Sequence, residues 1–125
     1  MNSPLNVAIL GASNVDSRYS NMAQRNLLQA GYKVIPVNPK YSEVMDVPTV
    51  ASLSDINEPV DTLTIYLDPS KLVQLVNEII ELHPRRAIFN PGTEAKHIES
   101  ALQEAGIKTE QACTLVLLRT GQFED

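Results

Sequence analysis

Apolar runs rich in Val and Ile alternate with segments of helical periodicity along this chain, and the pair recurs about every 25 to 30 residues. The first run, Leu5 to Leu10, shows no polar alternation. A parallel strand covered by helices on both faces has this character, because neither face meets water. Further strands are predicted at residues 33–37, 61–67, 87–90 and 107–110. This rhythm is typical of consecutive βαβ units.

The helical segments between the strands have recognisable ends. The first helix is predicted to end at Gly31, with an inner face formed by Met22, Ala23, Leu27 and Leu28. A later helix is predicted to begin at Thr93 as its N-cap and to end at Gly106. Both helices would pack an apolar stripe against the sheet.

The clearest helical periodicity runs from Pro69 to His83, where Asp68 is the expected N-cap and Pro69 occupies the first helical position. Its apolar residues recur at one-turn spacing and predict one buried stripe. We therefore expect an α/β fold, a doubly wound Rossmann-like parallel sheet of about five strands with helices on both faces.

Three segments are harder to interpret. Pro36 cannot donate a hydrogen bond to a neighbouring strand, so the second strand should be short or leave that position unpaired. Val50 could add a small strand of its own. Residues 114–125 carry an apolar run that fits either a helix or a strand, packed on the domain or on a second copy.

The composition limits the class of protein. The 125 residues, 43% of them hydrophobic, suit one globular domain spanning residues 1–125. A net charge of -5 gives no broad basic surface for nucleic acid. No apolar run is long enough to span a membrane and no secretory signal is recognisable, so we expect a cytoplasmic protein. Cys113, the only cysteine, suits a reducing compartment.

The loop after the first strand, residues 11–21, is a candidate anion site. A strand followed by Gly11 and a helix N-terminus directs free backbone N–H groups and the positive end of the helix dipole at one crevice. Ser13, Asn14 and Ser20 add polar side chains, and Arg18 adds a guanidinium suited to phosphate oxygens. The alternative is that the Ser and Asn residues only cap the helix and that Arg18 is solvated.

The loop after the second strand, Asn38-Pro39-Lys40, distinguishes between cofactors. An NAD site usually ends this strand with Asp or Glu, which accepts from a ribose hydroxyl. A cation in that place indicates a ribose that bears a phosphate, as in NADP or coenzyme A. An ordinary surface lysine is the alternative for Lys40.

The remaining loops give little support for catalysis. Asp68-Pro69 and Asn90-Pro91-Gly92-Thr93 would close the other side of the crevice, although plain turns and caps explain both equally well. No metal-ligating cluster, nucleophile elbow or phosphate-binding P-loop occurs, so we predict no catalytic and no metal-ligating residues. His83 and His97 fit surface positions on helices. Cys113 fits a packing role, or a mixed disulfide with a thiol if it is exposed near the ligand.

Several stretches resemble the small stand-alone CoA-binding proteins, whose single domain is similar to the CoA-binding domain of the succinyl-CoA synthetase alpha subunit. The resemblance covers nearly the whole chain. It rests on VAILGAS, Asp16-Ser17-Arg18 with Ser20, LLQAGYKVIPVNPKY, ASLSDINEPVD and Cys113. It implies that Gly11, Ala12, Ser13, Arg18 and Ser20 surround the diphosphate, that Asn38, Pro39 and Lys40 meet the 3′-phosphate, and that Leu67, Pro69 and Gly92 border the rest of the cofactor.

Three functions follow from these observations. The leading hypothesis is a non-catalytic protein that binds CoA or acyl-CoA, because the loops offer anion recognition without a paired acid and base. The second is an oxidoreductase or ligase-like enzyme that uses NADP or acyl-CoA. The third is an interaction module that forms a homodimer and has a vestigial crevice.

Overall fold

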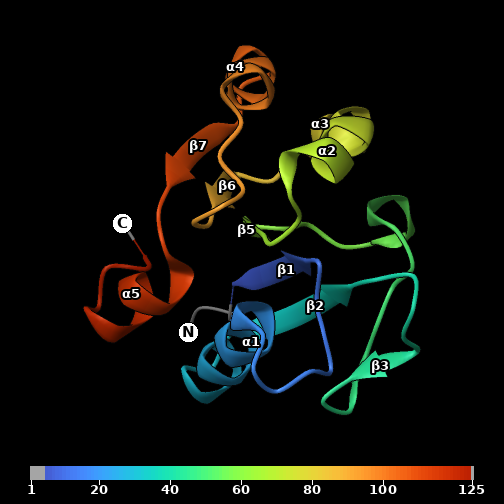
Figure 1. The fold of residues 1–125 in the computed structure, drawn as a ribbon, viewed down its shortest axis with the longest axis vertical. Helices are drawn as coiled ribbons and strands as arrows, with labels where there is room; N and C mark the ends of the chain where they lie inside the picture. Colours follow the sequence, from blue (N-terminus) through green and yellow to red (C-terminus); the bar gives the residue numbers. More distant parts are fainter. Residues whose placement is uncertain (1–4, 125) are drawn as a thin grey trace.

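A computed structural model describes residues 5–124 and shows a five-stranded parallel sheet with helices on both faces (Figure 1). The strands run in the order β2-β1-β5-β6-β7. Their bounds are β1 Asn6–Leu10, β2 Lys33–Val37, β5 Thr62–Ile65, β6 Arg86–Phe89 and β7 Lys108–Gln111. The predicted α/β fold is thereby confirmed, and each predicted strand lies within two residues of its expected ends.

Helices from different parts of the chain cover the two faces of the sheet (Figure 1). α1 (Tyr19–Gln29) and α5 (Thr114–Arg119) lie on one face. α2 (Pro69–Leu72), α3 (Val76–Leu82) and α4 (Lys96–Glu104) lie on the other. Strand residues alternate between the two cores: Val7 and Ile9 face α1, whereas Ala8 and Leu10 face α3 and α4.

The order in which strands are added to the sheet reverses at β1. From β1 the chain passes to β2 on one side, and it then crosses to β5, β6 and β7 on the other side. In an open α/β sheet the ligand crevice lies at the carboxyl ends of the strands beside this reversal. The loops that follow β1, β2 and β5 therefore border the place where a ligand would lie.

β2 has the predicted bounds Lys33–Val37, and Pro36 lies within it, in register with Ile9 of β1. The Pro36 carbonyl accepts from the Val50 N–H on the outer edge, at 3.1 Å. The imide nitrogen of Pro36 points to the same edge, because both groups of one strand residue face the same side. Val50 adds only a single bridge, to Val37.

The helices differ from the sequence prediction in three respects. The segment from Pro69 to His83 is not one helix, since a 3₁₀ turn (η2, Val73–Leu75) separates α2 from α3. Thr93 does not cap α4, whose N-cap is Ala95; the Thr93 hydroxyl instead donates to the Asn90 carbonyl oxygen, 2.7 Å away. Leu28 is 38% exposed and lies outside the buried face of α1.

Two further segments complete the fold. A hairpin of β3 (Glu43–Val44) and β4 (Val47–Pro48), which the sequence did not suggest, follows β2, and a short 3₁₀ helix, η1 (Leu53–Asp55), precedes β5. The C-terminal apolar run forms the helix α5, one of its two expected forms. No helix within residues 5–124 has the length and apolar character of a membrane span.

Candidate functional site

Two adjoining cavities occupy the carboxyl ends of the strands. The larger, about 460 Å³, is the loop cavity; it lies between residues 11–20 and residues 91–93. The smaller, about 340 Å³, is the helix cavity; it lies between residues 37–40, residues 51–53 and one face of α2 and α3. Both cavities are lined by Gly11, Asn38, Lys40, Leu67 and Lys71, so they form one continuous crevice.

Ten of the twelve residues predicted from the sequence line this crevice. They are Gly11, Ala12, Ser13, Arg18, Ser20, Asn38, Pro39, Lys40, Leu67 and Gly92. Pro69 is not among the lining residues. Asn14 is turned away, because its side chain donates to the Glu43 carbonyl and accepts from the Met45 N–H, and so fastens the β3-β4 hairpin.

Gly11 is required by the close approach of two loops. Its φ of 93° lies in the left-handed region, and a Cβ at this position would stand 3.2 Å from the Tyr66 carbonyl group and from the Leu67 side chain. A side chain here would therefore strain the backbone and push the β1 and β5 loops apart. Gly11 therefore allows the β1 and β5 loops to lie close together at the base of the crevice.

The backbone N–H groups of Gly11 and Ala12 are not free. Both donate to the Val37 carbonyl oxygen, at 3.1 and 3.3 Å. At the start of α1, by contrast, the N–H groups of Tyr19 and Ser20 form no hydrogen bond with any described residue. An anion at this site would meet the N-terminus of α1.

Polar side chains of the first loop mainly brace the loop. The Ser13 hydroxyl accepts from the Val15 N–H, and Asn21 donates to the Ser13 carbonyl oxygen. Asn38 joins two loops, since its amide donates to the Ala12 carbonyl at 2.7 Å and its oxygen accepts from the Lys40 N–H. None of these residues is the N-cap of α1; Arg18 is, and its side chain forms no capping hydrogen bond.

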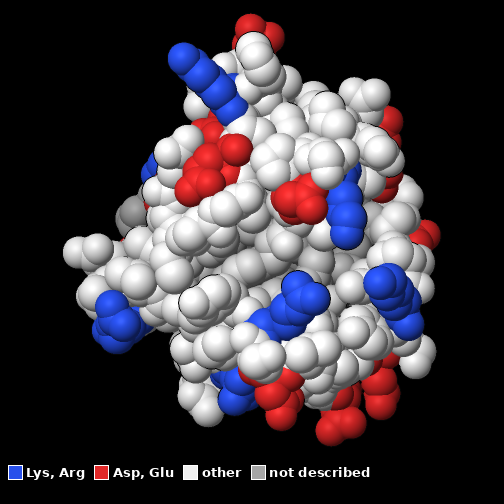
Figure 2. Space-filling view, viewed as in Figure 1, with Lys and Arg blue, Asp and Glu red and all other residues white. Residues whose placement is uncertain are grey.

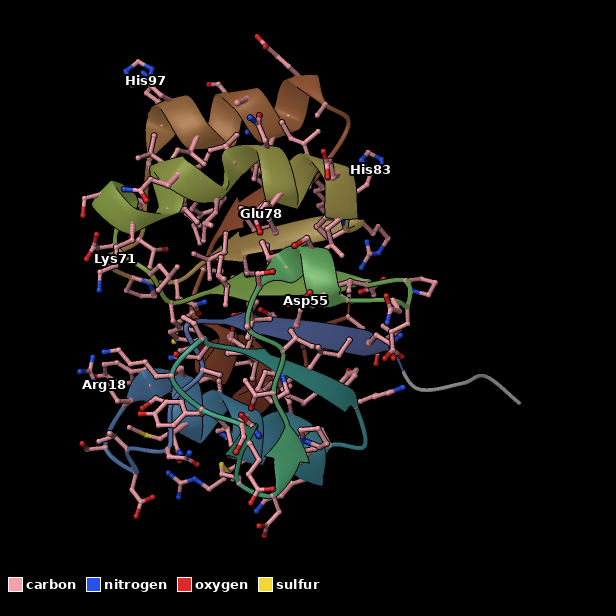
Figure 3. All side chains as sticks on the ribbon, turned by 90° about the vertical axis from the view of Figure 1, so that its right-hand side faces the viewer. Arg18, Asp55, Lys71, Glu78, His83 and His97 are labelled. Atoms are coloured by element: carbon pink, nitrogen blue, oxygen red, sulfur yellow. The ribbon has the colours of Figure 1, made fainter. Side chains whose placement is uncertain are left out.

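Three cations remain available around the crevice. Arg18, Lys40 and Lys71 are exposed, line the crevice and form no ion pair with any described residue. Figure 3 shows Arg18 and Lys71 at the same edge of the molecule, one beside α1 and the other beside α2. Figure 2 views this edge of the molecule face-on and shows a hollow there, with basic side chains above and below the hollow. Lys71 was not predicted from the sequence.

Acidic and phenolic groups near the crevice are few. Asp68 caps α2 through the Lys71 N–H, and hydrogen bonds from Ser70 and then Lys71 lower the pKa of its carboxyl. Burial raises the pKa of Tyr66 to about 12, although the neighbouring Thr114 and Thr64 hydroxyls partly offset it. The Tyr66 hydroxyl is enclosed without a hydrogen bond to a described residue. None of these groups is matched with a base that could receive its proton.

The remaining candidates for chemistry lie outside the crevice. His83 ends α3 on the side of the molecule opposite Arg18 and Lys71, and His97 projects from the first turn of α4 (Figure 3). Cys113 is half-buried beside Tyr66 and is not a lining residue. Within residues 5–124, no group of three His, Cys, Asp or Glu residues is arranged to hold a metal ion.

Comparison with known proteins agrees with this geometry. A crystal structure titled only as an uncharacterized protein is 38% identical, covers 98% of this chain and all of its own, and has a TM-score of 0.91. The structure of cell-free ID.343 from Thermus thermophilus is 35% identical, with 96% of this chain and 91% of that chain covered and a TM-score of 0.87.

Two curated relatives are longer than the regions they share with this chain. YneT from Bacillus subtilis is 33% identical over 75 residues, which are 60% of this chain and 56% of YneT. The ADP-forming acetate–CoA ligase I of Archaeoglobus fulgidus is 40% identical over 105 residues, 84% of this chain and 14% of the ligase. The chain thus spans about half the length of the first relative and a small part of the second.

A family model described as a CoA binding domain matches residues 6–119, which include every strand of the sheet and both cavities. The chain therefore belongs to the CoA binding domain family.

Proposed function

We propose that this protein holds CoA or an acyl-CoA in the crevice as a non-catalytic binding module. The observation that carries the proposal is the convergence of three cations on one continuous crevice: Arg18 and Lys40 from the loops after β1 and β2, and Lys71 from α2. Such unpaired cations suit a ligand with several phosphates. Family membership favours CoA among the phosphorylated nucleotides.

The two cavities suit the two ends of this ligand. The diphosphate would lie between Arg18 and the N-terminus of α1, and the 3′-phosphate near Lys40. The adenosine would then enter the helix cavity, and the pantetheine chain would follow the loop cavity toward Gly92. Both cavities are within the size range of small-molecule sites.

The absence of a matched acid and base among the lining residues supports binding without chemistry. Tyr66 keeps its proton at physiological pH, because its pKa is about 12. Asp68 is occupied in capping α2. A bound thioester would therefore meet no activated nucleophile from the described residues.

Ligand specificity tests the proposal directly. Native mass spectrometry of the freshly purified protein, followed by titration calorimetry with CoA, acetyl-CoA and NADP, should show retention and micromolar or tighter binding of the CoA species and weaker binding of NADP. Prolonged incubation with acetyl-CoA should release no free thiol. Stronger binding of NADP, or turnover of acetyl-CoA, would favour an enzyme instead.

A further inference from the structure

The strap, residues 38–45, runs from the end of β2 into the β3-β4 hairpin and carries Lys40 and Tyr41 along the crevice. Its first residue is attached to the loop after β1, because the Asn38 amide donates to the Ala12 carbonyl oxygen at 2.7 Å. The Asn38 side-chain oxygen also accepts from the Lys40 N–H at 2.8 Å. This end of the strap is thereby fixed at the base of the crevice.

The far end of the strap is held by Asn14 of the same loop. Asn14 Nδ2 donates to the Glu43 carbonyl oxygen at 2.9 Å, and Asn14 Oδ1 accepts from the Met45 N–H at 3.1 Å. Both strap groups belong to the main chain, so one amide side chain satisfies a donor and an acceptor of the backbone. Met45 begins the hairpin turn in the left-handed region, with a φ of 52°. That conformation is unfavourable for a residue with a side chain, so the bond to Asn14 helps to maintain it.

These two attachments tie together the loops that carry two of the crevice cations. Arg18 ends the loop after β1, and Lys40 lies between the two attached ends of the strap. Both cations line the loop cavity. A nucleotide with a diphosphate and a ribose phosphate presents its two charged groups over a limited range of spacings. Loops already held at a matching spacing bind such a ligand without the cost of ordering them.

The hairpin itself does not depend on Asn14. Val44 is fully buried in the same apolar cluster as Leu27 of α1, and Gln24 of α1 donates to the Val44 carbonyl oxygen at 2.9 Å. Asn14, by contrast, is exposed. Loss of its side chain should therefore release the strap from the loop after β1 while the hairpin stays packed on α1. The expected change lies in the placement of Lys40 and not in the fold.

We propose that Asn14 is a positioning residue: it holds Lys40 in place for a phosphate on the ribose of the ligand, and so makes the crevice selective for nucleotides that carry this phosphate. The inference rests on the proposed function, since it concerns the same crevice. Asn14 acts through the strap, because both polar atoms of its side chain are bonded to the strap backbone.

Calorimetry with CoA and dephospho-CoA tests this role, because the two ligands differ only in the ribose phosphate. The wild-type protein should bind CoA about fivefold more tightly, as expected for an exposed charge pair. Asn14→Ala should reduce this ratio to about two or less and change dephospho-CoA affinity less than twofold. The double variant Asn14→Ala/Lys40→Ala should bind CoA no more weakly than Lys40→Ala alone, since both changes remove one interaction. A purely structural role would weaken both ligands alike.

Asn26→Ala is the matched control, because Asn26 is exposed on α1 and does not line the crevice. It should leave the ratio unchanged. A wild-type ratio near one, an unchanged ratio in Asn14→Ala, or losses that multiply in the double variant would overturn the positioning role even if CoA binds. If the protein binds NADP instead of CoA, the proposed function fails. An NADP-to-NAD affinity ratio that depends on Asn14 would then support this inference, and one that does not would overturn it. If no nucleotide binds, both are overturned.

Discussion

At the amino ends of the strands the charged side chains form ion pairs, whereas at the carboxyl ends three cations face an open crevice without an ion pair to any described residue. Arg86 begins β6 and is fully buried: its Nε donates to Thr62, its Nη1 lies 3.4 Å from Glu110, and its guanidinium carbon lies 4.7 Å from the Phe123 ring centroid. Arg18, at the other end, is exposed and has no ion-pair partner among the described residues.

Asp61, which precedes β5 at the amino ends of the strands, is also paired with an arginine. Burial tends to raise the pKa of its carboxyl, but hydrogen bonds from Arg85 and Thr62 outweigh that and lower it. Its Oδ1 lies 2.8 Å from Arg85 Nε. One sheet thus separates two uses of charge: pairing that holds the C-terminal segment in place, and cations without an ion pair to a described residue that remain available to a ligand.

A substitution of Phe123 tests whether the amino ends of the strands contribute to stability alone. Phe123 is 2% exposed and packs edge-on against Tyr32, with 5.1 Å between the ring centroids. Phe123→Ala should lower the free energy of unfolding by about 3 to 4 kcal/mol in urea denaturation, through lost burial and a cavity beside Arg86. Phe123→Leu should cost less. CoA affinity should change less than twofold; a tenfold loss would show that the two ends are coupled.

The next effect concerns Tyr66, which lies beneath the open crevice. Its pKa of about 12 exceeds the usual value of 10.0, mainly because of burial. The folded protein therefore keeps a proton that the unfolded chain releases, so stability is intact below pH 10 and falls as the pH rises toward 12. The loss is on the order of 2 kcal/mol. In Tyr66→Phe the fall in unfolding free energy between pH 9 and 12 should become smaller without disappearing, because burial and a hydrogen bond to Glu124 also raise the pKa of Tyr32 to about 12. An unchanged fall in Tyr66→Phe would contradict this role of Tyr66.

The fold was predictable because its signals are local. Apolar runs located β1, β2, β5 and β6, whereas the polar β7 was expected from its place after the helix that ends at Gly106; Asp68 before Pro69 located the start of α2. The β3-β4 hairpin was missed because Met45 and Asp46 adopt positive φ without glycine. Thr93 was taken for a helix cap because its hydroxyl suits that role, but its bond to Asn90 closes a turn instead.

The site was predictable only in part. Loops at strand ends identified Arg18 and Lys40, since topology alone brings those loops together. Lys71 and Glu78 were missed because they lie on the polar side of a helical segment, where sequence cannot separate a solvated face from one that meets a crevice. The spacing of about one helical turn between Lys71, Gln74 and Glu78 was the only signal available. It indicates a cavity wall only once residues 51–53 are seen to line the opposite side of the same cavity.

Arg18→Ala should weaken binding of CoA and dephospho-CoA alike, by about tenfold, because the guanidinium is placed for the diphosphate that both ligands share. Unfolding free energy should stay within about 0.5 kcal/mol of wild type, since Arg18 is exposed. Arg119→Ala, at the exposed end of α5, is the matched control. Unchanged affinity for both ligands would show that Arg18 is merely solvated and would weaken the contrast with Arg86.

The smallest effect separates Lys40 from the other crevice cations. Lys40→Ala should weaken CoA binding by roughly fivefold and dephospho-CoA binding by much less, because only CoA carries the 3′-phosphate. The difference should shrink at high salt, as expected for an exposed charge pair. Lys96→Ala, on the exposed start of α4, controls for net charge. Equal losses for both ligands would place Lys40 at the diphosphate that they share.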